Sequence, residues 1–276
     1  MTPARAGATR ASFSALLSAL ALAGCGGGLP LLHPARTLRP GAVRAAAGFS
    51  GSVATGDLAS ALRNAQSDAS ASAGAPGTDA TYAKGALVAA SIAPGLAPFA
   101  GARVGLGSDF EAGLTYTGRA LRADARRSFE LGDHLSLSIG AGASAALFGH
   151  QDGSALPNVD LGNLHGWGAD VPVLVGYASD ADVYLLWIGA RGGWERIDID
   201  DVRSEPKPAA SGPPIGLSAE RFWGGGLVGV AVGFRHVHVA MEIEACYASV
   251  TGDYSGIHTQ VTGWALSPAT ALWWRF

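Results

Sequence analysis

The stretch that decides the fold is HLSLSIGAGASAALF, residues 134–148. Leucine, isoleucine and alanine occupy one parity from Leu135 to Leu147, whereas serine and glycine fill the other parity from Ser136 to Ser144. Such alternation is typical of a β-strand with one apolar and one polar face. The stretch is longer than the ~5–6 residues of a usual globular strand. We therefore expect long strands whose two faces meet different environments.

The same alternation along the chain predicts ten strands. They lie near 42–54, 97–107, 110–117, 119–131, 134–148, 168–178, 182–198, 218–234, 236–250 and 259–276. Tight turns alternate with long connections at 55–96, 149–167, 199–217 and 251–258, with Gly118 the one tight turn where a long connection is expected. Transmembrane barrels have this asymmetry and, in bacteria, an even number of strands. We predict an all-β, antiparallel, up-and-down transmembrane β-barrel of about ten strands over residues 42–276, with eight or twelve strands as alternatives.

The long connection 55–96 is the least regular part of that barrel. Thr81 to Ala93 is rich in alanine, and an additional strand there would break the alternation of short and long connections. We expect a helix or an inserted loop in that place. Asp57 to Ala73 has only weak helical spacing, so we expect it to be loosely packed or mobile.

Composition limits the class of protein. The chain is 48% hydrophobic and 15% charged, and its net charge of −3 offers no basic surplus for nucleic-acid binding. Beyond the N-terminal segment, no apolar run approaches the ~20 residues that a membrane helix needs. Only helices and closed barrels satisfy all backbone hydrogen bonds in lipid, which favours the barrel.

The N-terminus has the features of an export signal. Arg5 and Arg10 precede a short apolar core, and Leu22 to Cys25 resembles the lipobox of bacterial lipoproteins. The resemblance implies a signal peptide over 1–24, lipidation of Cys25 and a lipidated tether over 25–41. The alternative is an ordinary signal peptide that is cleaved near Cys25.

Charged residues on the polar parity form the main candidate site. A charge that faces lipid costs about 2–4 kcal/mol at the bilayer midplane, so these groups should face the lumen and pair there. The predicted members are Arg103, Glu111, Arg122, Asp124, Arg126, Glu130, Arg191, Glu195, Arg235, Glu242 and Glu244. We expect an ion-pair network that plugs the barrel, with a narrow polar pore or a small-ligand pocket as alternatives.

Other clusters are weaker candidates, and we predict no catalytic site, metal site or cofactor. His236, His238 and Glu242 share one face, but solvated histidines explain them better than a metal ligand set. The spacing of Gly224 to Gly229 lacks the helix that a dinucleotide fingerprint must open. The remaining loop candidates are His150, Asp152 and His165 for hydrolysis, and Asp198, Asp200, Asp201 and Glu205 for a divalent cation.

Aromatic residues cluster near the predicted strand ends, as the girdles of a membrane barrel require. These residues are Tyr116, Phe129, Phe148, Tyr177, Tyr184, Trp194, Phe222, Phe234, Tyr247, Trp264, Trp274 and Phe276. On the alternating strands and the terminal Trp274-Arg275-Phe276, residues 42–276 resemble small bacterial outer-membrane β-barrel proteins.

The resemblance implies an outer-membrane location, contact with outer-membrane lipid, a monomeric state and assembly by the barrel assembly machinery, which would recognise Trp274 and Phe276. Phe276 would then end in the periplasm, with the long loops outside. We expect a non-enzymatic protein with a structural role, or a narrow passage for small solutes. The alternatives are a hydrolase active at the barrel rim and a soluble periplasmic lipoprotein with a ligand-binding β-sandwich.

Overall fold

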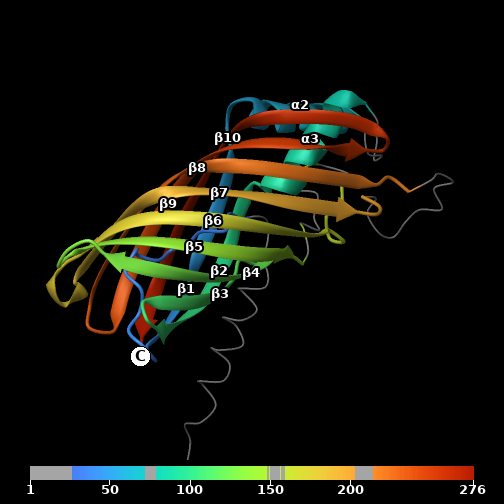
Figure 1. The fold of residues 1–276 in the computed structure, drawn as a ribbon. Helices are drawn as coiled ribbons and strands as arrows, with labels where there is room; N and C mark the ends of the chain where they lie inside the picture. Colours follow the sequence, from blue (N-terminus) through green and yellow to red (C-terminus); the bar gives the residue numbers. More distant parts are fainter. Residues whose placement is uncertain (1–26, 72–78, 148, 150–155, 157–158, 203–213) are drawn as a thin grey trace, which may run out of the picture.

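Ten antiparallel strands close into a barrel in the computed structural model (Figure 1). The structure describes residues 27–71, 79–147, 149, 156, 159–202 and 214–276. Each strand pairs with its neighbours in sequence, and β1 closes the barrel against β10. The predicted up-and-down barrel of ten strands is confirmed.

The strand bounds agree closely with the predicted ranges except at one hairpin. The strands are β1 (Val43–Ala54), β2 (Gly95–Gly107), β3 (Phe110–Tyr116), β4 (Ala120–Glu130), β5 (Leu135–Ala146), β6 (His165–Ala178), β7 (Tyr184–Ile199), β8 (Leu217–Phe234), β9 (Val237–Tyr254) and β10 (Ile257–Arg275). A short 3₁₀ turn, η1 (Asp180–Asp182), joins β6 to β7. The expected long loop at 251–258 is wrong, because β9 and β10 continue to a tight turn at Ser255 and Gly256, whose φ values are 52° and 80°.

Two helices follow β1 and pack at one end of the barrel (Figure 1). Of the helix or inserted loop expected over 81–93, the structure has the helix, α3 (Ala80–Ile92). It begins after Asp79, whose Oδ1 accepts from the Thr81 and Tyr82 N–H groups at 2.8 and 2.9 Å. α2 (Gly56–Ala71) is better packed than expected, because Leu58 and Ala65 are fully buried. The weak hydrophobic periodicity of α2 did not predict this packing, because its few apolar residues pack mainly against helix α3. No helix that the structure describes is long and apolar enough to cross a membrane.

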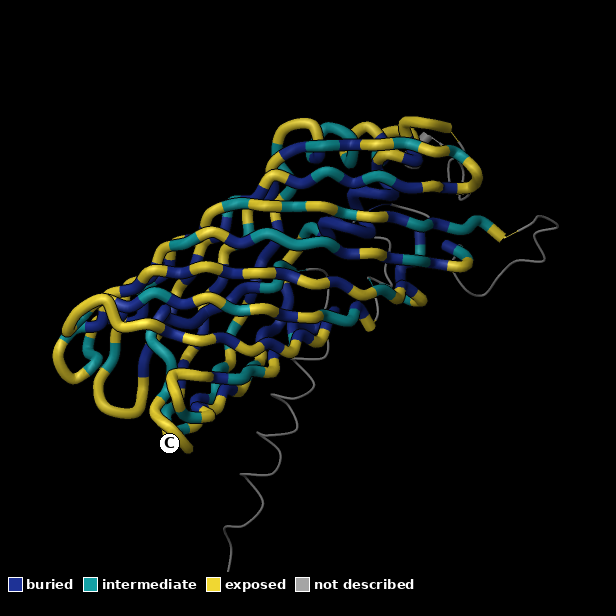
Figure 2. The backbone as a smooth tube through the Cα atoms, in the orientation of Figure 1, coloured by how far each residue is buried: buried dark blue, intermediate teal, exposed yellow. Residues whose placement is uncertain are grey.

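Burial alternates residue by residue along the strands (Figure 2). In β9, Val239, Met241 and Ile243 point outward and are each 55% exposed, whereas Glu242 and Glu244 point inward and are buried. An apolar exterior around a charged interior is the reverse of a soluble sandwich. This arrangement requires an apolar solvent outside the wall.

The polarity of both faces inverts near the helical end of β9. Beyond Tyr247 the outward residues become Ser249, Thr251 and Asp253, and the inward ones include Val250, which is fully buried. The same inversion occurs in the neighbouring strands, where Arg196, Asp198, Glu220, His258 and Gln260 point outward. The apolar exterior therefore ends at a defined level, and these strands continue beyond it into a polar environment.

Two rings of aromatic residues bound the apolar exterior. The ring toward the helices comprises Trp167, Trp194, Phe222, Tyr247 and Trp264, and the ring toward the C-terminus comprises Phe110, Phe129, Tyr177, Tyr184, Phe234, Trp274 and Phe276. On β10, Trp264 and Trp274 lie about 25 Å apart along the axis, from a rise of about 3.3 Å per residue and a tilt of about 40°. That height matches the apolar band of a membrane barrel.

Candidate functional site: the barrel lumen

The N-terminal segment 27–42 runs through the lumen, from the helical end of the barrel to its C-terminal end. Near the helices, the Gly27 N–H donates to the Ala93 carbonyl and the Gly28 N–H to the Gly51 carbonyl, both at 3.2 Å. At the other end, the Gly41 N–H donates to the Gly105 carbonyl at 2.9 Å before the chain enters β1. The segment assigned as a tether thus lies inside the barrel. Cys25 and the signal peptide lie outside the described residues.

Glu242 of β9 holds the middle of this luminal segment. Its carboxylate accepts the Leu31 N–H at 2.7 Å and the Leu32 N–H at 3.0 Å. The Trp187 indole N–H donates to it at 2.8 Å. Both consecutive amides point at one carboxylate, and Leu32 adopts a positive φ of 46°. Three N–H donors therefore satisfy this buried carboxyl group.

Apolar side chains of the segment pack on the wall formed by β6 to β10. Leu31, Leu32 and Ala35 belong to one buried cluster with the stacked rings of Trp187 and Trp273, whose centroids lie 5.8 Å apart. Gly229 leaves room for the Trp187 ring, because a Cβ there would lie 2.1 Å from it. The segment fills this side of the lumen by close packing.

The opposite side of the lumen binds the segment through its backbone. Arg126 donates to the carbonyl of Pro34 and, at 3.2 Å, to that of Arg36. Glu111 accepts the Leu38 N–H at 2.8 Å. Both charged faces of the lumen therefore use the segment to complete their hydrogen bonds.

The luminal charges form one connected series of ion pairs across the barrel. Glu111 contacts Arg44, Arg103 and Arg126, Asp124 contacts Arg103 and Arg122, and Asp170 contacts Arg122 and Arg191. Arg191 continues to Glu244 at 3.3 Å and to the Leu29 carbonyl of the luminal segment. Arg122 binds Asp170 through two bonds of 2.8 Å each, the bidentate geometry that favours arginine.

Sequence reasoning missed two members of this network, Arg44 and Asp170, which are 2% and 5% exposed. Both lie on the inward parity of their strands, so the alternation could have found them. Two predicted members lie elsewhere. Glu130 is exposed at the end of β4, and Arg235 is exposed in the tight β8–β9 turn, over the Phe234 ring at 5.1 Å. Parity failed for these two because each stands where its strand ends.

A second group of charges binds the C-terminal end of α3. Arg119 donates to the Ala90 carbonyl at 2.5 Å, and Arg221 donates to the Ser91 carbonyl at 2.8 Å. Ser52 Oγ donates to the Ile92 carbonyl at 2.9 Å. The last carbonyls of a helix have no partner within it and carry partial negative charge, so two guanidinium groups stabilise them. The predicted luminal residue Glu195 joins this group by binding Arg221 at 2.7 Å.

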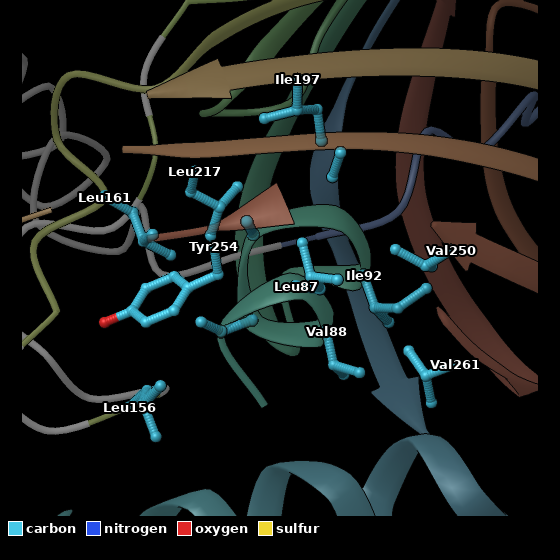
Figure 3. Close-up of a cluster of buried hydrophobic side chains, with 14 of the residues drawn as sticks. Leu87, Val88, Ile92, Leu156, Leu161, Ile197, Leu217, Val250, Tyr254 and Val261 are labelled. Carbon is cyan, nitrogen blue, oxygen red and sulfur yellow. The ribbon is translucent and has the colours of Figure 1, made fainter. Parts of the chain in front are cut away.

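Above the apolar exterior, α3 closes the mouth of the barrel with a hydrophobic cluster (Figure 3). Leu87 and Val88 of α3 pack among inward side chains of the extended strands, including Ile197, Val250 and Tyr254. Burying a side chain such as Leu87 contributes about 1.5–3 kcal/mol. The inverted polarity of β7 to β10 is explained by this cluster, since their inner faces here meet a helix in place of charges.

The weaker candidate residues are not brought together. His238 is buried in the lumen and bonds the Asp182 carbonyl at 2.8 Å, whereas His236 is exposed in the β8–β9 turn. Asp198 pairs with Arg196 at 3.0 Å, and His165 is exposed at the start of β6. His150, Asp152 and Glu205 lie outside the described residues. Within the described ranges, no three side chains of metal-binding type come close enough to hold an ion.

Two cavities lie toward the two ends of the lumen. A cavity of about 50 Å³ lies beneath α3, between the luminal segment and Arg191, Arg221 and Glu244. A larger space of about 500 Å³ opens at the C-terminal end, around Arg36, His134, Asp182 and Arg275. Between the two lie the ion pairs of the wall and the buried residues of the luminal segment.

A closed barrel with an apolar band, two aromatic rings and a charged interior defines this chain as a transmembrane β-barrel. No family model and no curated protein matches it. Among solved structures, it is similar to Ail, the attachment invasion locus protein of Yersinia pestis, with 9% identity, a TM-score of 0.31 and coverage of 86% of this chain and 100% of that chain. It is also similar to Neisserial surface protein A, with 10% identity, a TM-score of 0.32 and coverage of 85% and 96%. We draw no conclusion from likenesses with TM-scores this low. The assignment as a transmembrane β-barrel rests on the strand pairing and on the apolar exterior.

Proposed function

We propose that this protein is a closed, non-enzymatic barrel of the bacterial outer membrane, with a structural role. The observation that supports this most directly is the luminal segment 27–42, which is hydrogen-bonded to both charged faces of the lumen. Of the two roles expected from the sequence, a structural role therefore suits the geometry better than a passage for solutes.

The orientation follows from the two ends of the barrel. Phe276, beside the start of β1, would face the periplasm, and the end with α2 and α3 would lie outside the cell. We expect the barrel assembly machinery to recognise Trp274 and Phe276, and the protein to be a monomer. We also propose that Cys25 is lipidated.

The role that we propose is to hold a rigid surface outside the membrane. Strands β7 to β10 extend beyond the aromatic ring, and α3 supports their inner face. Their outer face carries charged pairs suited to water, such as Arg196 with Asp198 at 3.0 Å and with Glu220 at 3.6 Å. A wall that is packed inside and polar outside is a stable surface for display.

Conductance of the purified protein in planar lipid bilayers tests this role. We expect no ohmic steps, since the luminal segment and the ion pairs leave no continuous aqueous path. The matched positive control is the double variant Arg126→Ala with Glu242→Ala, which removes side-chain contacts to residues 31–36. That variant should conduct intermittently while it still migrates on unheated SDS gels as a folded barrel. Steady ohmic steps from the wild-type protein would overturn the closed barrel.

A further inference from the structure

One charged residue of the barrel wall faces lipid. Among the strand residues that the structure describes, Arg127 of β4 is the one charged side chain on the outward parity from the helical aromatic ring down to the level of Phe129, and it pairs across strands with Phe110 of the C-terminal ring. Its neighbours Arg126 and Ser128 point inward and are 3% and 5% exposed. A charged group that faces lipid is rare in membrane proteins, which makes it a candidate functional site.

The guanidinium of Arg127 lies between two phenylalanine rings. Its Cζ is 5.3 Å from the centroid of the Phe110 ring on β3 and 5.1 Å from that of the Phe129 ring on β4. Both rings are about 40% exposed and belong to the C-terminal aromatic ring of the barrel. Cation–π contact with two faces holds the group in one place. No ion pair or hydrogen bond of this guanidinium is formed within the described part of the chain.

The height of Arg127 brings this cation to the membrane interface. It lies three residues before Glu130, the last residue of β4, which is about 8 Å along the axis at a rise of about 3.3 Å per residue and a tilt of about 40°. The guanidinium lies beside Phe110 and Phe129 of the C-terminal aromatic ring, which marks the interface on this side. Lipid-facing arginine costs only about 0–1 kcal/mol there, so the position is tolerable if an anion is present.

We propose that Arg127, between Phe110 and Phe129, binds the phosphate of a phospholipid in the periplasmic leaflet. The planar guanidinium suits bidentate contact with phosphate oxygens. The two phenylalanines would meanwhile pack against the upper acyl chains. The site rests on the orientation proposed above, and it is independent of whether the lumen conducts.

Native mass spectrometry of the full chain, released from detergent with added phosphatidylglycerol, tests the site. We expect the wild-type protein to retain one phosphatidylglycerol, and Arg127→Gln to retain about fivefold less, as loss of one interfacial cation predicts. Arg127→Lys should lie between them, because it keeps the charge but loses the planar contacts. The matched control is Arg235→Gln, which removes a cation at the same end that stacks on the Phe234 ring alone.

Four results would overturn the proposal. Equal retention by wild type and Arg127→Gln would exclude a role for the guanidinium, and an equal loss in Arg235→Gln would reduce it to a general charge effect. Retention of diacylglycerol as strong as that of phosphatidylglycerol would show that acyl chains alone bind. Arg127-dependent retention of lipid A in place of phosphatidylglycerol would assign the site to the other leaflet and reverse the orientation. If the protein conducts ions and still binds phosphatidylglycerol through Arg127, the proposed closed lumen is wrong and the lipid site stands.

Discussion

Replacing Glu242 by alanine should release the luminal segment and destabilise the barrel. The carboxylate accepts three buried N–H groups, from Leu31, Leu32 and Trp187, at 2.7 to 3.0 Å. Each buried donor that loses its partner costs about 1–3 kcal/mol. Because water can enter the space that the side chain leaves, we expect a total loss of about 3–6 kcal/mol in the free energy of unfolding. Glu242→Gln keeps one acceptor oxygen, so it should lose about half as much.

The assay is urea unfolding of the protein in lipid vesicles, followed by tryptophan fluorescence, with folding checked by the shift of unheated samples on SDS gels. Trp187 and Trp273 report directly on the segment, since both rings pack against it in the same buried cluster. The matched control is Glu130→Ala, which removes an exposed carboxylate from the end of β4 and should change stability by less than about 0.5 kcal/mol. If Glu242→Ala unfolds within about 0.5 kcal/mol of the wild-type protein, the carboxylate does not hold the segment and this reasoning is wrong.

Two further predictions concern the wall. In vesicles of brominated lipid, the fluorescence of the outward tryptophans should be quenched, and that of Trp187 and Trp273 in the lumen should not. The outward tryptophans are Trp167, Trp264 and Trp274, which are 58%, 53% and 46% exposed. Trp264→Phe should therefore remove a quenched component and Trp187→Phe an unquenched one, and the opposite result would contradict the placement of the faces. Gly229→Ala should destabilise the barrel by about 1–3 kcal/mol, since its Cβ would meet the Trp187 ring at 2.1 Å, while Gly226→Ala, whose nearest neighbour is 3.7 Å away, should be close to neutral. Equal unfolding midpoints for these two glycine variants would show that the ring is not held in place.

Strand number and facing could be predicted because both depend on local pattern. The alternation in β5 and β9 fixes which side chains share a face, and alternation needs no knowledge of the partner strand. The extent of β9 could not be predicted in this way. If one face of the strand is assumed to be apolar throughout, Val250 and Tyr254 would break the alternation, because they are apolar residues at inward positions. The alternation of inward and outward side chains in fact continues. What changes is the surroundings, from lipid to water outside and from charged side chains to helix α3 inside.

The candidate site was only partly accessible from the sequence. Inward charges such as Arg122 and Asp124 were identified from parity, but their connection to Asp170 depends on the pairing of β4 and β6 with β5, where Gly142 leaves room for the Arg122 guanidinium to pass over the strand. The position of Arg127 was equally unexpected, because parity places it on the apolar face, where no local rule explains a charge.

By itself, the sequence determined that this chain forms long antiparallel strands with an apolar exterior and a charged interior, because a side chain's face follows from its parity alone. Only the tertiary structure decided that residues 27–42 occupy the lumen and that α3 closes its mouth. The contacts responsible join positions far apart in the chain, such as Leu31 with Glu242 and Arg221 with Ser91. Closure of the barrel brings these groups together. The pattern of residues within each segment depends on local structure, so it does not indicate which distant segment will be in contact.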